Sequence, residues 1–423
     1  MKETAKLFDS RYMWPFILVT TLFLFWGIPN NLNDVLIRQF MKTFEINRLN
    51  AGLVQSAFYM GYFIIPIPAA VFMRRYGYKS GLLLGMLMFS AGTLLFWPSA
   101  IIGKYIFFLG SLFIIASGLA FLELGANAFI VELGDPGSSE RRLNFSQAFN
   151  PIGSVLGVLL GTMFIFSGVE PDETTVAAMK AAGEYEGFLR GEIMRVVNPY
   201  VVLGAVVFVW TILMSRAKFP NVEVAKEDEP KGGYKLVLKN PHFIKAVISQ
   251  FLYNGAQVGT WSFFIQYVQD YTGQGEKFAG FMLTGTLLAF GVGRFSATYL
   301  MRFIQPSKLM GIYGIANILL VSIGIFFPGW VGVWCIFATS FFMSLMYPTN
   351  FALGVKGLGN MTKTGGSVLV MSIVGGAIFP PLMGLMAEKT GMAIAMSLPL
   401  ICYIYITYFA FDNLNGNSVK RNV

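Results

Sequence analysis

Apolar residues in this chain come in blocks of about 20, the length that a helix needs to cross the hydrocarbon core of a bilayer. Soluble helices and strands would instead show one-sided or alternating apolar positions. Twelve blocks predict twelve membrane-spanning helices, at residues 14–40, 49–73, 79–97, 103–131, 142–168, 198–215, 241–269, 278–301, 308–327, 330–354, 365–387 and 393–411. The pattern therefore predicts an all-α membrane protein.

The long polar interruptions suggest how the helices are grouped. Residues 216–240 mix both charges with Pro and Gly, which is typical of a linker. We therefore expect an N-terminal six-helix bundle at 1–215, a cytoplasmic linker at 216–240 and a C-terminal six-helix bundle at 241–423. The other long interruption, 169–197, is acidic, and we expect it outside the membrane as a loop with one short surface helix.

The two halves show weak internal similarity. FMRRYGYKSGLLLG at 72–85 and LMRFIQPSKLMGIYG at 300–314 follow the second span of each half, and both place Arg at a membrane end. Two pseudo-symmetric six-helix bundles are a recurring design of secondary transporters, in which the substrate binds between the halves at mid-membrane.

Composition and charge agree with a multi-pass membrane protein. The chain is 55% hydrophobic and 13% charged, whereas a soluble domain carries roughly 25% charged residues. Its net charge is +9. With both termini in the cytoplasm, most Lys and Arg fall on the inner side, so this charge indicates topology rather than nucleic-acid binding. We expect a monomer in the cell inner membrane, in contact with lipid.

Cofactor chemistry finds little support. No GxxxxGK[ST] loop is present to hold a nucleotide phosphate, which argues against an ATP-driven pump. The single histidine, His242, excludes a multi-histidine metal site. We therefore expect neither a cofactor nor a metal.

The first span carries a dense group of polar residues. WGIPNNLNDVLIRQF, at 26–40, places Asn30, Asn31, Asn33 and Asp34 within five residues. Hydrocarbon penalises such groups by several kcal/mol each unless they face a partner or a wet cavity. This helix is expected to line a polar pathway that uses Asp34; the alternative is an aspartate that caps a helix at the interface.

Two further charges lie inside predicted spans. Glu123 is near the middle of the fourth span, and Asn127 shares its helix face. An acid at this depth favours a proton carrier, although a permanently protonated side chain bonded to a neighbour is the alternative. Arg294, in the eighth span, is an intramembrane cation. Its expected partner is a carboxylate of the other half or the C-terminal end of a broken helix.

The fifth span begins with two amides on one face. Gln147 and Asn150 are three residues apart, and amides both donate and accept hydrogen bonds, which suits a ligand rich in hydroxyls. Gly153, Gly157 and Gly161 follow at a spacing of four. That ridge favours close helix packing over ligand contact.

The seventh and tenth spans carry aromatic residues with interleaved amides. Tyr253, Gln257 and Trp261 are spaced by four, and Tyr347 and Asn350 flank Pro348. An aromatic face beside an amide is able to hold a sugar ring, with its C–H face on the aromatic ring and its hydroxyls on the amide. Packing, or an aromatic belt at the interface, remains the alternative.

Several stretches resemble the L-fucose–proton symporter family of the major facilitator superfamily. They cover nearly the whole chain: NNLNDVLIRQF, AGLVQSAFYMGYFIIPIPA, LFWPSA, LELGANAFIVELG, RLNFSQAFN, YNGAQVGTWSFFIQY, LTGTLLAFGVGRF and MYPTNFALGVKGLG. The resemblance implies that Asp34 and Glu123 take the places of two membrane carboxylates linked to proton coupling and sugar recognition. It also implies that Gln147 and Asn150 face the central cavity and that Asn31 contacts the sugar.

Two positions depart from the family pattern. Arg74 stands where the superfamily's loop motif has an acid, so the gating role of that acid does not carry over. Asn127 is followed by Ala128, where the symporter family has proline, so the local helix shape is expected to differ.

The expected function is import of a monosaccharide, first of all L-fucose, by proton symport as two bundles rock. Carriers of glucose, galactose or N-acetylglucosamine, and sodium-coupled or uniport versions, are the alternatives. A membrane sugar sensor lacks an output module in this sequence. An enzyme acting on lipid-linked sugars lacks catalytic acids at the membrane surface.

Overall fold

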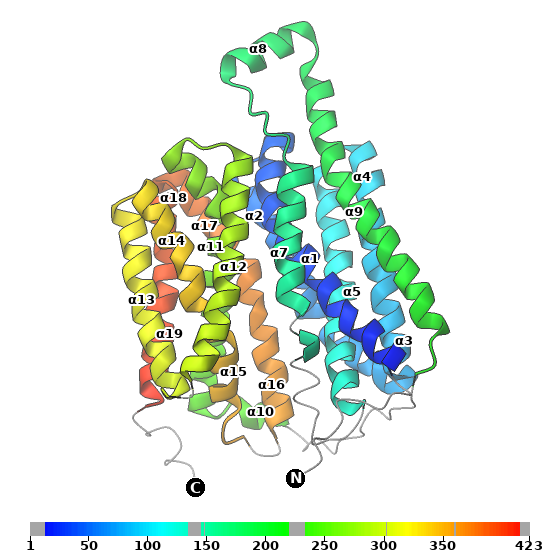
Figure 1. Ribbon diagram of the computed structural model, residues 1–423, viewed down its shortest axis with the longest axis vertical. Coiled ribbons are helices and arrows are strands. Elements are labelled where there is room, and N and C mark those ends of the chain that lie inside the picture. The colour runs from blue at the N-terminus through cyan, green and yellow to red at the C-terminus, as the bar shows by residue number, and fades with distance from the viewer. Residues whose placement is uncertain are drawn as a thin grey trace. The chain divides into compact units, whose positions relative to one another are not determined.

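The computed structural model describes residues 13–133, 145–147, 149–219, 233–301, 303–358 and 361–414. Within these ranges the regular structure is helical and contains no strand (Figure 1). The loop cations Arg141 and Arg142, the terminal residues 1–12 and residues 220–232 of the predicted linker lie outside the described residues.

The chain divides into two compact units. Unit 1 consists of Met1–Glu45 and Ala57–Lys226, and unit 2 of Ile46–Ser56 and Glu227–Val423. The second boundary falls within 216–240, whose role as a linker stays a prediction. The first boundary lies inside α2 (Arg48–Ile64), so the start of this helix belongs to unit 2 and its end to unit 1.

Unit 1 is built from long helices with two short ones and a π-helical segment. In chain order they are α1 (Met13–Phe44), the end of α2, α3 (Pro66–Leu94), α4 (Phe96–Ile102), α5 (Tyr105–Glu132), α7 (Phe149–Leu160), η3 (Gly161–Ile165), α8 (Glu173–Ala182) and α9 (Tyr185–Arg216). α3 packs along α5, and α1 along α7.

The single surface helix predicted within 169–197 is wrong in its extent, because the structure divides it into α8 and the first turns of α9. α9 begins at Tyr185 and continues without interruption to Arg216, so the helix of the sixth predicted span begins earlier than expected. The short helix α8 ends at Gly183, whose φ of 73° is left-handed and terminates the helix at little steric cost to a glycine. Figure 1 shows α8 beyond the ends of α1 and α7.

Gly153 and Gly157 of α7 pack against the backbone of α1, which confirms the predicted close helix packing. A Cβ atom on Gly153 would collide with the carbonyl oxygen of Leu24, and one on Gly157 with that of Ile28. Gly27 of α1 meets the backbone of Asn150 in the same way. Small residues on both helices let the two backbones approach closely, which is how membrane helices gain packing energy.

Replacing Gly157 by valine tests this contact. We expect Gly157→Val to lower the stability of the purified protein by about 1 to 3 kcal/mol, because the added methyl groups force α1 and α7 apart. The measurement is thermal unfolding in detergent. Gly110→Val in α5 is the matched control, since a Cβ at Gly110 meets no atom within 4 Å. Equal losses in both variants would contradict close packing at Gly157.

A buried polar cluster joins α1 to α9. The Lys42 ammonium lies 2.6 Å from a carboxylate oxygen of Glu192, with side-chain exposures of 9% and 5%. Gln39 donates to the same carboxylate at 3.1 Å, and Lys42 also donates to Ser167 Oγ and to the carbonyl oxygen of Val169. The cluster therefore fixes the segment after η3 against the end of α1.

The charge of Glu192 is expected to matter for stability. Glu192→Gln leaves Lys42 buried without its counter-ion, a change that costs about 3 to 5 kcal/mol in buried pairs. We expect a loss near the lower value, since Ser167 and Val169 still accept from the ammonium. Thermal unfolding again provides the measurement. The control is Lys180→Gln, which breaks the exposed pair between Lys180 and Glu45 at 3.8 Å and should change stability by less than about 1 kcal/mol.

Unit 2 begins with the first turns of α2. Within this unit Arg48 pairs with Asp270 at 2.6 Å, and the backbone N–H of Leu49 donates to Glu388 at 2.8 Å. Its other helices are α10 (Gly233–Val237), α11 (Pro241–Thr272), α12 (Glu276–Leu300), α13 (Pro306–Phe326), α14 (Trp330–Met343), α15 (Met346–Val355), α16 (Thr362–Met371), η5 (Ser372–Val374), α17 (Gly375–Thr390), α18 (Met392–Ala395) and α19 (Ser397–Asp412).

Two of the predicted spans in unit 2 are broken helices. The tenth is divided between α14 and α15, and the eleventh between α16 and α17, with η5 between them. Breaks of this kind free backbone groups inside the membrane, where they must be satisfied by protein or line a cavity.

Eleven helical segments of the described residues are long and apolar enough to cross a membrane. They match eleven of the predicted spans. The remaining predicted span is α11, which is 32 residues long. It carries amides and hydroxyls along much of its length, including Gln250, Asn254 and Gln257. Its polarity therefore separates it from the other spans and makes it a candidate for lining a pathway.

Candidate functional site

Three of the four polar residues of the α1 stretch are buried. Asn31, Asn33 and Asp34 are each less than 9% exposed. Asn31 donates back to the carbonyl oxygen of Gly27 at 3.2 Å, one turn earlier. Both polar side-chain atoms of Asn33 lack a partner among the described residues. A polar helix face inside the protein is the arrangement that membrane burial demands.

Glu123 lies in α5, which packs on α1 within unit 1. Its surroundings include Tyr62 of α2, which is near enough for an electrostatic interaction with the carboxyl group. The Tyr62 hydroxyl in turn donates to Asn30 of α1 at 3.5 Å. A tyrosine therefore connects the polar stretch of α1 to the acid of α5.

The two amides expected at the start of the fifth span take different positions. Gln147 Nε2 donates to Asn127 Oδ1 at 3.1 Å, which brings two predicted site residues together one turn beyond Glu123. Asn150 instead donates to the carbonyl oxygen of Phe23 at 3.4 Å, in the contact between α7 and α1. The exposed Gln147 side chain is thus available to a ligand, whereas Asn150 is partly engaged in helix packing.

In unit 2, three of the predicted residues form one group. The rings of Tyr253 and Tyr347 meet edge-on, with centroids 6.0 Å apart. Both tyrosines lie within electrostatic range of Arg294. The Tyr253 hydroxyl is buried and has no partner in the part of the chain that the structure describes.

Asn350 bonds to a residue of α11, and Trp261 bonds to a residue of α14. Asn350 Oδ1 accepts from Ser249 at 2.9 Å, and its amide nitrogen has no partner among the residues described. Trp261 donates its indole N–H to Ser340 at 3.0 Å and packs edge-on against a phenylalanine of α12. Gln257, one turn before Trp261, is half-buried. Trp261 therefore has its polar atom engaged, whereas Asn350 keeps two free donor hydrogens.

Arg294 contacts the end of a broken helix. Its Nε donates at 3.2 Å to the carbonyl oxygen of Ser344, the residue that follows the last turn of α14. Its guanidinium carbon lies 4.8 Å from the centroid of the Phe290 ring. Of the two expected partners, the described contacts show this helix end. Cations favour a helix C-terminus because the last carbonyl groups lack intrahelical partners.

The structure also shows polar residues that sequence reasoning missed. Tyr62 bridges two helices of unit 1, and Gln250 of α11 is fully buried with neither side-chain atom paired among the described residues. The sequence contained a signal for both. Tyr62 lies in AGLVQSAFYMGYFIIPIPA, one of the stretches that resemble the symporter family, and Gln250 is one turn before Asn254 on the most polar span. No group of three or more His, Cys, Asp or Glu residues in the described ranges is placed to hold a metal.

Known proteins resemble this chain over nearly its whole length. The family model of the Major Facilitator Superfamily matches residues 16–380. The L-fucose-proton symporter of Escherichia coli K12 is 38% identical over 95% of this chain and 93% of its own length. The chain belongs to the major facilitator superfamily. A glucose/galactose transporter of Brucella abortus is 32% identical over 96% of this chain and 95% of its own length.

Solved structures of the superfamily share the fold. The transporter FucP in its outward conformation has a TM-score of 0.70 at 38% identity, with 95% of this chain and 99% of that chain covered. A bacterial homolog of the human lysosomal transporter Spinster has a TM-score of 0.74 at 15% identity, over 96% and 97% of the two chains, which shows the fold alone. The chain therefore has the twelve-helix fold of major facilitator transporters and is a multi-pass membrane protein, not an enzyme.

Proposed function

We propose that this chain is a secondary active transporter that imports a monosaccharide with protons by alternating access, and that L-fucose is its substrate. The observation that carries the proposal is the polar interior of unit 1, where Asp34 is buried on α1 and Glu123 lies on α5, which packs on α1, one turn from the Asn127–Gln147 pair. The 38% sequence identity with an L-fucose-proton symporter supports L-fucose as the sugar and the proton as the coupled ion.

Asp34 and Glu123 are proposed to carry the coupling. An ionised carboxylate in a closed, water-poor cavity is costly, and protonation removes that charge. Proton binding therefore favours closure over sugar, and the differential stability of the two states couples the proton to the sugar. Tyr62 and Asn30 provide a polar connection from Glu123 to the helix of Asp34.

Sugar recognition is proposed for groups in each unit. In unit 1 they are Asn31, Asn127, Gln147 and Asn150. In unit 2, the sugar's hydroxyls would bond to amides and its C–H face would rest on aromatic rings, provided by Tyr253, Gln257, Trp261, Tyr347 and Asn350. Arg294 is proposed as an intramembrane charge that holds the broken tenth span near these residues.

Topology and assembly complete the proposal. We propose that the protein lies in the plasma (inner) membrane with both termini cytoplasmic, divided into bundles at 1–215 and 241–423 by the linker at 216–240. It would function as a monomer surrounded by lipid. The excess of Lys and Arg in the segments assigned to the inner side supports this orientation.

The carboxylates can be tested by neutralising each in turn. We expect Asp34→Asn and Glu123→Gln to reduce uphill sugar uptake to the level of empty vesicles, because neither variant exchanges a proton at that position. Exchange of labelled for unlabelled sugar, which needs no net proton movement, should persist. The measurements are uptake driven by an imposed pH gradient and counterflow in proteoliposomes. Glu45→Gln, an exposed carboxylate of unit 1, is the control. If uphill uptake persists in both variants, carboxylate coupling is wrong.

A hexose panel identifies substrate and ion together. We expect L-fucose to alkalinise the medium outside vesicles that contain the protein, because each sugar carries a proton inward. D-glucose, D-galactose and N-acetylglucosamine provide the competing assignments, of which the first two are favoured by the 32% identity with a glucose/galactose transporter. Uptake that depends on sodium without alkalinisation would replace the proton by sodium. Failure of every sugar would overturn the assignment of substrate class.

A further inference from the structure

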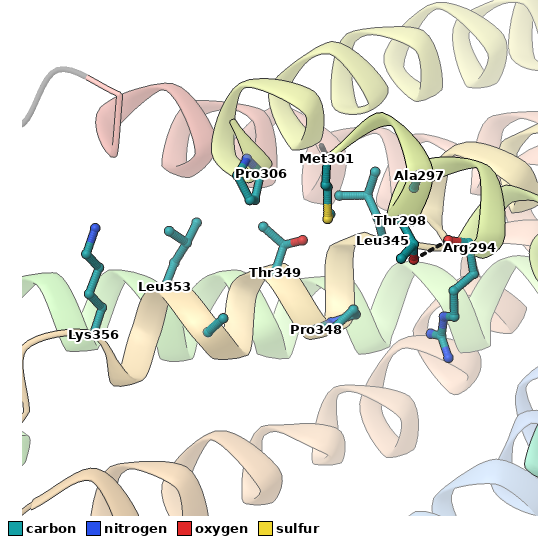
Figure 2. A pocket seen from close by; sticks show the side chains of 11 residues that line it. Arg294, Ala297, Thr298, Met301, Pro306, Leu345, Pro348, Thr349, Leu353 and Lys356 are labelled. Carbon is teal, nitrogen blue, oxygen red and sulfur yellow. Dashed lines mark hydrogen bonds between the residues drawn. The ribbon is translucent and has the colours of Figure 1, made fainter. Parts of the chain in front are cut away.

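A crevice of about 370 Å³ opens in unit 2, between the end of α12, the start of α13 and the length of α15. Figure 2 shows its residues from Lys356 at one end to Arg294 at the other. The volume lies at the lower end of the range of about 300 to 1,000 Å³ typical of small-molecule pockets. Every lining residue belongs to unit 2, so the crevice exists within this unit alone.

The walls of the crevice are mainly apolar. Ala297 of α12 and Met301 just after it form one wall, and Leu345, Pro348 and Leu353, at and along α15, form the other. A sugar bound there would lose hydrogen bonds to water without recovering them from these side chains. A hydrocarbon chain would lose nothing comparable, and it would gain contact with each wall.

Two polar groups, one on α15 and one just after its end, interrupt the apolar lining. The hydroxyl of Thr349 is 4% exposed and has no hydrogen-bond partner among the described residues. Lys356 lies seven residues later, immediately after the last residue of α15, where the backbone becomes extended, and it lines the crevice at its other end. By contrast, Thr298 across the crevice already donates to the carbonyl oxygen of Arg294 at 2.8 Å. A ligand of this crevice therefore needs an acceptor for Thr349 and a negative charge for Lys356.

The guanidinium of Arg294 is engaged elsewhere. It bonds to Ser344 and stacks near the Phe290 ring, as described above. In Figure 2 its side chain extends away from Thr349. The available positive charge is consequently at the Lys356 end.

That end of the crevice lies where membrane spans terminate. The span Trp330–Val355 ends immediately before Lys356, and the span Pro306–Phe326 begins with a lining residue. α12 beside the crevice exposes large apolar side chains at successive turns, with Phe295 78% and Tyr299 58% exposed. The crevice thus adjoins surface that faces lipid, with its cation at the level of lipid headgroups.

We propose that this crevice binds one anionic phospholipid. An acyl chain lies along the apolar walls, an ester carbonyl oxygen accepts from the Thr349 hydroxyl, and the phosphate pairs with Lys356. Phosphate, ester and acyl chain follow each other in a glycerophospholipid in the same order as Lys356, Thr349 and the apolar walls. Basic pockets between membrane helices recognise anionic headgroups by this charge. The proposal does not depend on the transported sugar.

Lipid titration of the full-length protein in neutral detergent tests the proposal. Dioleoylphosphatidylglycerol, dioleoylphosphatidylcholine and inorganic phosphate are added separately, and native mass spectrometry and thermal unfolding report binding. We expect one phosphatidylglycerol to be retained more tightly than phosphatidylcholine and to raise the unfolding temperature, with phosphate alone giving no effect. Equal retention of the two lipids, or an equal effect of phosphate, would overturn the proposal.

Three variants separate the contributions of the site. Lys356→Gln should weaken phosphatidylglycerol about fivefold, the loss expected for one basic residue at a membrane surface, and leave phosphatidylcholine unchanged. Thr349→Val, nearly the same shape, should weaken both lipids about fivefold by removing the hydrogen bond. Ala352→Phe should block both by filling the crevice, which Ala352 lines.

Lys308→Gln is the matched control, because Lys308 is an exposed cation near the start of α13 that does not line the crevice. It should leave both affinities unchanged. Wild-type affinity for phosphatidylglycerol in Lys356→Gln, or equal losses in the control, would reject the crevice as the site. Should Ala352→Phe fail to fold, the lysine and threonine variants still decide the matter.

Discussion

Hydrocarbon cannot hydrogen-bond, and the rest of this structure depends on that constraint. Each polar atom at membrane depth must find a partner within the protein or water in a cavity. The bond from Tyr62 to Asn30 and the bond from Arg294 to Ser344 are solutions of the first kind. Gln250, with neither side-chain atom paired among the described residues, is a candidate for the second.

Close helix packing and broken helices are complementary consequences. Gly153 and Gly157 bring α7 against the backbone of α1, which fixes the helix that carries Asp34. The break between α14 and α15 does the opposite, since it releases the carbonyl group of Ser344 for Arg294. One helix is thus packed along its backbone against a neighbour, whereas the other presents a backbone carbonyl group to a charged side chain.

Particular residues show how far the chain could be read before its structure was known. The polar stretch around Asp34 and the acid at Glu123 stood out because they interrupt apolar blocks, and both lie in packed helices of unit 1. Contacts between different helices could not be predicted from the sequence. Nothing in the spacing indicated that Gln147 would bond to Asn127, or that Asn150 would bond to the backbone of α1. The extension of α9 back to Tyr185 was not predicted from the sequence. The first turns of α9 are polar, and the helix is longer than a membrane crossing requires, so no apolar block marks where it begins.

The sequence by itself determined the helical membrane fold, the positions of the spans and the residues whose polarity is out of place there. These follow from the local cost of burying polar groups and from the thickness of the bilayer, which act on each segment separately. The tertiary structure alone decided which polar groups bond to one another, such as Tyr62 with Asn30 and Arg294 with the end of α14. It also decided which buried group, the Thr349 hydroxyl, has no partner in the described chain. The physical reason is that pairing depends on rotation and approach of helices distant in sequence, which no local pattern encodes.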